Sequence, residues 1–171
     1  MTEMIDIYDA QKRLTGKSVP RGSQLSADEY WFSIKVCIFN SDATKLLIQK
    51  RSAAKAYFPN IWDVSVAGAV SSGELPYQAA ERELTEELGL KIDLSAVPSR
   101  LTLGWHDGWS EIFLLKEEVN LSALTLQPEE VAEVRWVTQA ELTELRQSGG
   151  FIPYIWLDHI FDYARTEDEY E

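Results

Sequence analysis

Residues 68–90 read GAVSSGELPYQAAERELTEELGL, and this stretch decides the fold. Pro76 suits the first turn of a helix, because its missing amide hydrogen would have no partner there. The segment 77–88 contains strong helix formers and no interior glycine or proline. Gly89 follows at the position where a left-handed residue ends a helix. The stretch therefore predicts a helix over 77–88.

Three glutamates share one face of this predicted helix. Glu83, Glu86 and Glu87 are three and four residues apart, so their carboxylates project from the same side. Like charges at this spacing destabilise a helix by about 0.2–0.5 kcal/mol per pair. A hard divalent cation, which prefers oxygen ligands, would offset the repulsion. The opposite face is apolar enough to pack on a sheet and consists of Ala79, Ala80, Leu84 and Leu88.

The whole stretch follows a known pattern, G-x5-E-x7-R-E-U-x-E-E-x-G-U, in which U is a bulky aliphatic residue. Its nine defined positions are filled by Gly68, Glu74, Arg82, Glu83, Leu84, Glu86, Glu87, Gly89 and Leu90. The stretch resembles the complete Nudix box of the Nudix hydrolases. A merely solvated acidic helix would explain neither Glu74 nor the glycine stop. The resemblance implies an α/β fold, an α/β/α sandwich with a mixed β-sheet. It also implies metal-dependent hydrolysis of a phosphoanhydride (diphosphate) bond in a nucleoside diphosphate linked to another moiety.

The resemblance assigns roles to the box residues. Glu83, Glu86, Glu87 and the carbonyl of Gly68 match the metal ligands of the family, with Mg²⁺ expected and Mn²⁺ as the alternative ion. Arg82 would hold a carboxylate in place, and Glu74 would fix the loop. The identity of the general base stays open between a box glutamate and Glu111. Glu111 corresponds to an acid at the metal site of related proteins, the isopentenyl-diphosphate isomerases. Glu130 is interpreted as a solvated loop acid.

Residues outside the box are candidates for binding the substrate, which we expect to be a small phosphorylated molecule, a nucleotide derivative. Arg51 and Lys55 in QKRSAAK correspond in part to diphosphate-binding residues of the isomerase relatives. A forked guanidinium also suits phosphate oxygens. Trp31, Trp105 and Trp109 could stack on a flat group, although aromatic residues in strands more often belong to the core.

Two other functions compete with hydrolysis. The segments LLIQKRS and FPNIW, together with an N-terminal YD, resemble the subgroup related to isopentenyl-diphosphate isomerase. Those enzymes carry a cysteine nucleophile and a metal-binding histidine just before the box, where this chain has Ala67 and Ala69. Alanine supplies neither a thiolate nor an imidazole, which disfavours the isomerase. A non-catalytic nucleotide sensor is disfavoured because the box keeps every acid.

The length of 171 residues fits one domain. The resemblance implies a single Nudix domain over 1–171, with a core at about 6–147, a C-terminal helix at 153–164 and an acidic tail at 166–171. The net charge of −12 argues against a nucleic-acid polymer as partner. No apolar run approaches a membrane span, and the acidic start predicts no signal peptide. The lone Cys37 fits a reducing cytoplasm, and a homodimer is expected from family habit.

Hydrophobic patterning places the other elements. We expect strands at 30–40, 45–51, 61–70, 101–105, 110–117 and 131–137, a helix at 139–147, a short strand and turn at 4–14, and a surface loop at 17–28. The strands 101–105 and 110–117 should form a hairpin around Asp107-Gly108.

Overall fold

A mixed sheet of seven strands forms the centre of the protein in the computed structural model, which describes residues 2–166. Its central strand, β3 (Trp31–Phe39), runs parallel to β8 (Gly108–Lys116), whereas every other pair in the sheet is antiparallel. On its other side β3 pairs first with β6 (Val66–Ala69) and then, at its end, with β4 (Lys45–Arg51). The remaining strands are β7 (Leu101–Trp105) beside β8, and β5 (Trp62–Asp63) and β9 (Val131–Thr138) beside β4.

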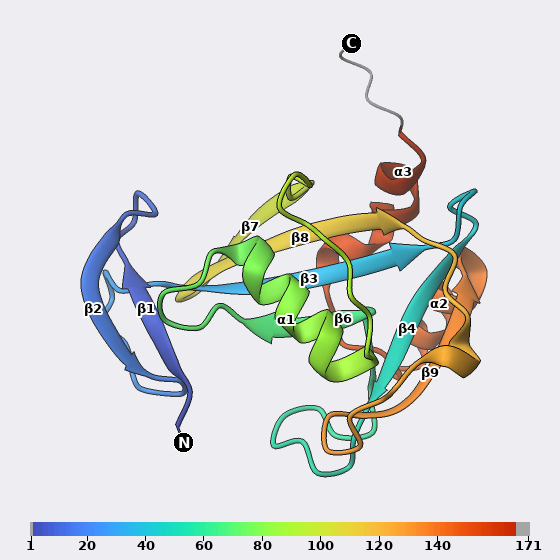
Figure 1. Ribbon diagram of the computed structural model, residues 1–171, viewed down its shortest axis with the longest axis horizontal. Coiled ribbons are helices and arrows are strands. Elements are labelled where there is room, and N and C mark those ends of the chain that lie inside the picture. The colour runs from blue at the N-terminus through green and yellow to red at the C-terminus, as the bar shows by residue number, and fades with distance from the viewer. Residues whose placement is uncertain (1, 167–171) are drawn as a thin grey trace.

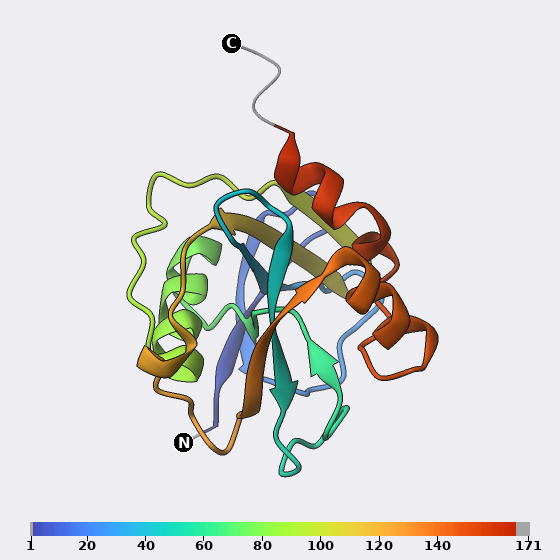
Figure 2. The ribbon, with the colours of Figure 1, turned by 90° about the vertical axis from the view of Figure 1, so that its right-hand side faces the viewer.

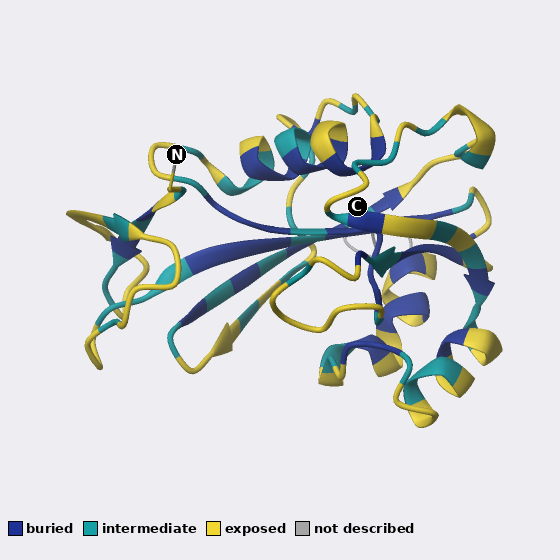
Figure 3. Ribbon diagram, turned by 90° about the horizontal axis from the view of Figure 1, so that it is seen from below, coloured by how far each residue is buried: buried dark blue, intermediate teal, exposed yellow. Residues whose placement is uncertain are grey.

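Helices cover both faces of this sheet (Figures 1 and 2). On one face lies α1 (Pro76–Leu88), and on the other lie α2 (Gln139–Gln147) and α3 (Ile160–Arg165). Side chains of β3 alternate between the two layers, because successive residues of a strand point to opposite faces. Figure 3 shows the buried central strands between the helical layers. The predicted α/β/α sandwich is confirmed. No helix among residues 2–166 is long and apolar enough to cross a membrane.

The predicted helix of the box forms as expected. α1 starts at Pro76 and ends at Gly89, whose φ of 71° lies in the left-handed region that glycine tolerates. The Gly89 amide donates to the Thr85 carbonyl over 3.0 Å. The predicted apolar face packs on the sheet, because Ala79, Ala80, Leu84 and Leu88 are all fully buried.

A buried serine holds the sheet together where β3 changes partners. The Ser65 hydroxyl, between β5 and β6, donates to the Leu47 carbonyl over 2.5 Å and accepts from the Ile38 amide over 2.8 Å. It thereby satisfies one backbone group on β4 and one on β3, which would otherwise be buried without partners. The expected strand 61–70 is consequently two short strands, and β6 leads directly into the box.

The N-terminal prediction needs one correction. β1 (Met4–Tyr8) is a strand, but the loop expected at 17–28 contains the end of a second strand, β2 (Leu14–Pro20). Together they form a separate two-stranded sheet beside the start of the box (Figure 1). The sequence LTGKSVP has weak strand preference, so β1 supplies the hydrogen-bonding partners that make it a strand.

The C-terminal helix is also shorter than predicted. A 3₁₀ turn spans Ile155–His159, and only α3, from Ile160, is α-helical. Phe151 and Ile152 are held extended beside Trp62, whose carbonyl accepts from the Ile152 amide over 2.9 Å. This anchoring delays the helix start. Of the predicted acidic tail, residues 167–171 lie outside the described residues.

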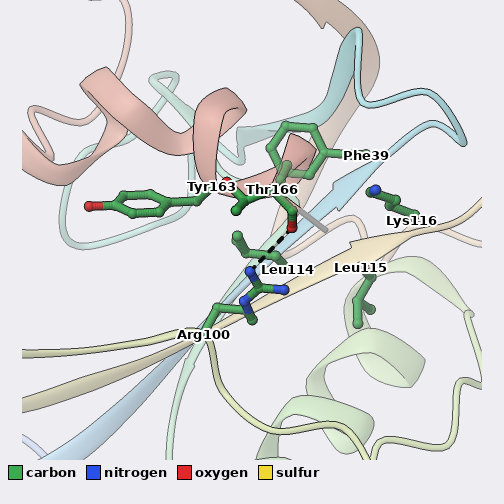
Figure 4. Close-up of a pocket in the computed structure, with 8 residues that line it drawn as sticks. Phe39, Arg100, Leu114, Leu115, Lys116, Tyr163 and Thr166 are labelled. Carbon is green, nitrogen blue, oxygen red and sulfur yellow. Dashed lines mark hydrogen bonds between the residues drawn. The ribbon is translucent and has the colours of Figure 1, made fainter. Parts of the chain in front are cut away.

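A small cavity of about 280 Å³ lies where α3 meets the sheet (Figure 4). Phe39 and Leu114 line it from the sheet, and Tyr163 lines it from α3. Arg100 donates to the Thr166 carbonyl across it over 3.5 Å. Its lining includes none of the predicted site residues, so this cavity belongs to the packing of α3.

Candidate active site

The glycine that begins the box touches the first glutamate of the acidic face. Gly68 lies in β6, and a Cβ atom built there would be 2.2 Å from Glu83 Oε1. No side chain fits in that space, so the backbone of β6 approaches the Glu83 carboxylate as only glycine allows. Gly68 and Glu83 are therefore in direct contact in the fold.

Arg82 organises the acids around this contact. Its Nη1 donates to Glu83 Oε1 over 2.8 Å and to Glu86 Oε2, one helical turn along, over 3.2 Å. Its Nε and Nη2 grip both oxygens of Glu74 at 2.8 and 3.1 Å. The hydrogen bonds to Glu74 raise the pKa of Arg82 above its usual range, and Glu83 adds to the effect. Glu74 also accepts from the Ser71 amide over 3.0 Å, so it fixes the loop as expected.

Two of the three glutamates are buried, which is costly for charged groups. The pKa of Glu87 is raised to about 8, mainly by burial and in smaller part by the nearby Glu83 carboxylate. Burial also raises the pKa of Glu83, although Arg82 opposes this effect. Glu87 accepts a hydrogen bond from Gln49 Nε2 over 2.8 Å, whereas the side chain of Glu86 is half exposed. Burial thus disfavours the charged forms of Glu83 and Glu87, and a bound cation would favour them.

The donor set fits a hard divalent cation, although the acids are not drawn together around one point. Within residues 2–166, no three His, Cys, Asp or Glu side chains are close enough to hold a metal ion. Arg82 donates hydrogen bonds to one oxygen each of Glu83 and Glu86, and Gln49 donates one to an oxygen of Glu87. The oxygens present are nevertheless of the kind that Mg²⁺ and Mn²⁺ prefer. The residues that would hold the ion are Gly68, Glu83, Glu86 and Glu87.

Glu111 lies apart from this cluster. Its carboxylate accepts hydrogen bonds from Ser99 and from Thr102, the latter over 2.8 Å. Strand register aligns Gly68 with Ile34 and Ile34 with Glu111, so Gly68 and Glu111 are two strand spacings, roughly 9–10 Å, apart. The structure does not join Glu111 to the box glutamates.

The two predicted phosphate contacts differ in their surroundings. Arg51 donates to Asp63 Oδ2 over 3.2 Å and to the Tyr57 carbonyl, and it lines a large cavity. Lys55 instead forms an ion pair with Glu130, which lies 75 residues further along the chain. Glu130 lies in a loop as expected, with its side chain 31% exposed and paired with Lys55. Only Arg51 of the two lines that cavity.

The cavity beside Arg51 has a volume of about 830 Å³ and lies on the face of the sheet opposite α1. We call it the aromatic cavity. It reaches the backbone of Gly68 and so adjoins the box. The walls are contributed mainly by rings and aliphatic groups: Trp31, Tyr57, Phe58, Leu103, Trp105, Ile152, Pro153, Tyr154, Ile155 and Trp156. Its volume lies within the range of small-molecule sites.

The tryptophans divide between the two faces of the sheet. Trp31 and Trp105 meet edge to face, with ring centroids 5.2 Å apart, in the wall of the aromatic cavity. Trp109 packs on the α1 side against Phe32. His106 lies in the turn of the β7–β8 hairpin.

The sequence analysis did not predict several polar residues of the aromatic cavity, among them Lys35, Asp63 and Tyr154. Asp63 is fully buried, and burial raises its pKa. The available signal was a lysine in the middle of the apolar segment FSIKVCIF, since lysine is rarely placed in a buried strand without a partner.

The α/β/α sandwich, with its glutamate-bearing helix packed against the strand that contains Gly68, defines a hydrolase scaffold. Comparison with known proteins identifies the family. The pattern of the NUDIX domain matches residues 30–157. The "Uncharacterized Nudix hydrolase lmo0368" of Listeria monocytogenes is 46% identical over 157 residues, which are 92% of each chain. The chain therefore belongs to the NUDIX domain family and is a Nudix hydrolase, an enzyme that acts on pyrophosphate bonds.

More distant relatives agree with the fold. The crystal structure of DR0079 from Deinococcus radiodurans superposes with a TM-score of 0.72 at 23% identity, over 96% of this chain and 100% of the other. The isopentenyl-diphosphate Delta-isomerase of Streptomyces griseus is 28% identical, with 95% of this chain and 83% of that protein covered. This weaker likeness is consistent with the predicted subgroup.

Proposed function

We propose that the protein hydrolyses a diphosphate linkage between a nucleoside and a second group, with Mg²⁺ as the working ion and Mn²⁺ as a substitute. The observation that carries the proposal is the contact of Gly68 with Glu83 beside Arg82, because it sets a carboxylate against a glycine whose backbone also lines a large cavity. Water would add to one phosphorus as its bond to the bridging oxygen breaks. The products would be two phosphate monoesters, with two protons released when both are fully ionised.

The box residues would divide the work in this reaction. Gly68, Glu83, Glu86 and Glu87 would hold the cation, which would supply positive charge to the phosphate oxygens. Arg82 keeps Glu83 and Glu86 in place through its shared nitrogen. The hydrogen bonds of Glu111 to Ser99 and Thr102 favour a box glutamate as the acceptor of the proton from water.

The aromatic cavity would bind the organic part of the substrate. Trp31 and Trp105 offer ring surfaces for a flat group, and Arg51 offers a forked donor for a phosphate. Ser33 and Ser110 share a hydrogen bond of 2.7 Å with each other, so these hydroxyls are already engaged. A wall with few free hydrogen-bonding side chains supports recognition by stacking more than by the edge of one particular base.

Substitution of Glu86 by Gln tests the assignment. Glu86→Gln keeps the shape of the side chain and removes its charge, so the cation would be held less well. We expect the rate of hydrolysis of the best substrate to fall by about 10²-fold or more, the size typical of losing one stabilising group at a reacting centre. The measurement is phosphate or nucleotide release from a panel of phosphoanhydrides with Mg²⁺ or Mn²⁺.

The matched control is Glu144→Gln, an equal change at an exposed glutamate of α2. This control should leave the rate near that of the parent. Equal rates for Glu86→Gln and the parent on the best substrate would exclude Glu86 from the metal site.

A further inference from the structure

Lys35 is placed where a strand normally carries an apolar side chain. It lies in the middle of β3, between Ile34 and Val36, which are both fully buried. Its neighbours face α1, so Lys35 faces the other layer and lines the aromatic cavity. Its backbone pairs with Ala67, the residue before Gly68. The ammonium group is therefore set into the cavity wall that adjoins the box.

The hydrogen-bonding capacity of this ammonium is poorly used. Its Nζ donates to the Ile34 carbonyl over 3.3 Å and to the Ser33 hydroxyl over 3.4 Å, both beyond the usual 2.7–3.2 Å. Among residues 2–166, no carboxylate oxygen lies within 4.0 Å of it. Nζ also lies 5.8 Å from the ring centroid of Tyr154. An ammonium has three donors, so at least one strong acceptor is missing.

The one carboxylate in the cavity wall is engaged elsewhere. Asp63 accepts from Arg51 Nη1 over 3.2 Å, from the Val64 amide over 2.8 Å and from the Tyr154 hydroxyl. It raises the pKa of Lys35, but burial lowers that pKa more strongly. Asp63 is thus largely satisfied by groups other than Lys35.

The cavity wall is positively charged although the chain carries a net charge of −12. Three cationic side chains line it, Arg21, Lys35 and Arg51, against the single carboxylate of Asp63 in the lining, while Arg21 is paired with Glu3 over 2.8 Å. An excess of cations around a concave site favours an anionic ligand. The missing acceptor of Lys35 and the charge of the wall therefore indicate the same ligand chemistry.

We propose that Lys35 is a substrate-positioning residue that binds a phosphate oxygen of the substrate beside Gly68. This assignment rests on the proposed function and extends it to one group that the box does not contain. The competing explanation is that Lys35 only balances the charge of Asp63. The two explanations differ in whether the binding of an anion in the cavity depends on Lys35.

Calorimetric titration with inorganic pyrophosphate in EDTA separates them, because it requires neither metal nor turnover. Lys35→Met and Lys35→Gln should each weaken binding roughly 10- to 100-fold, the usual effect of losing a hydrogen bond to a charged group. Lys35→Arg, which keeps the charge, should lose less. The matched control, Lys45→Met, alters an exposed lysine at the start of β4 and should bind like the parent. The Gln variant keeps a donor for the Ile34 carbonyl, so it remains testable if the Met variant fails to fold.

Steady-state kinetics on the best substrate gives the second readout. Loss of Lys35 should raise KM more than it lowers kcat. Unchanged pyrophosphate affinity in variants with reduced stability would make Lys35 a structural residue and overturn the assignment. Failure of the parent to bind pyrophosphate would do the same. If the parent cleaves no phosphoanhydride but binds pyrophosphate through Lys35, the proposed function fails and the role of Lys35 stands.

Discussion

At the scale of single residues, the addition of one carbon atom at Gly68 should reduce the rate of hydrolysis strongly while the protein still folds. The new Cβ in Gly68→Ala would meet Glu83 Oε1 at 2.2 Å, so the Glu83 side chain must move and its contact with Arg82 must change. A misplaced group at a reacting centre costs about 10²-fold in rate. We expect a loss of that size in hydrolysis, against a cost in stability of about 1–3 kcal/mol, typical of overpacking. Kinetics and urea unfolding of the same sample measure both.

Gly150→Ala is the control for this substitution. Its Cβ would lie 3.4 Å from the Leu145 carbonyl, close to ordinary contact, and Gly150 is remote from the box in sequence. Activity should stay near that of the parent. A Gly68→Ala enzyme with full activity would show that Glu83 need not keep its position beside β6.

Single residues also mark the limit of prediction from sequence. The contacts of Arg82 with Glu74, Glu83 and Glu86 follow from helix spacing and a nearby loop, so local rules predict them. The pairing of Lys55 with Glu130 joins positions 75 residues apart, and no local rule reaches that far. Lys35 was missed for the same reason, because only the packed fold shows that its side of β3 lines a cavity.

At the scale of elements, the β1–β2 hairpin is attached to the box loop by backbone pairing of Met4 and Ile5 with Ser72 and Ser71, and by the carboxylate of Asp6. Asp6 accepts from the Ser18 and Ser72 hydroxyls over 2.5 and 2.6 Å, and from the Gly73 amide over 2.8 Å. Burial raises the pKa of Asp6, but these hydrogen bonds outweigh it and lower the pKa below 3.8. A carboxylate with a depressed pKa adds stability above its unfolded pKa and loses it as the pH falls through the folded value. The attachment should therefore weaken only below about pH 4.

Nuclear magnetic resonance can follow this attachment at the Gly73 amide. In the parent, the amide shift should titrate with a midpoint below 3.8. Asp6→Asn should abolish that titration, because the amide side chain has no proton to gain in this range. Asp93→Asn removes a carboxylate that binds only its neighbour Ser95 and should leave the Gly73 titration intact. A Gly73 titration that survives in Asp6→Asn would show that the Asp6 carboxylate does not control the Gly73 amide.

Elements with strong local signals were predicted well, and those that depend on partners were not. α1 has Pro76, Gly89 and an apolar face, and its bounds agree with expectation. β2 contains glycine, lysine and proline, and it forms because β1 offers it hydrogen bonds. The segment 153–164 resembles a helix in composition, yet the pairing of Phe151 and Ile152 beside Trp62 leaves only its second half α-helical.

At the scale of the whole molecule, the two faces of the sheet carry different groups. α1 brings acids to one face, and the C-terminal segment closes the aromatic cavity over the other. Both meet at Gly68, because β6 contributes its glycine to each. The box motif identified the first face, whereas the cavity joins β3, β7 and residues 152–156 and has no sequence signature. Formation of a homodimer stays a prediction, which sedimentation would check.

A cation that binds the folded protein alone must also stabilise the whole molecule. At a free concentration of 100 times Kd, one such ion adds about 2.7 kcal/mol to the free energy of unfolding. We expect Mg²⁺ to raise the Tm of the parent and to raise that of Glu86→Gln much less at the same concentration. Sodium chloride at matched ionic strength controls for general screening of the net charge of −12. Equal shifts in the parent and Glu86→Gln would mean that Mg²⁺ acts on the acidic surface at large, since a defined site needs Glu86 and diffuse attraction does not.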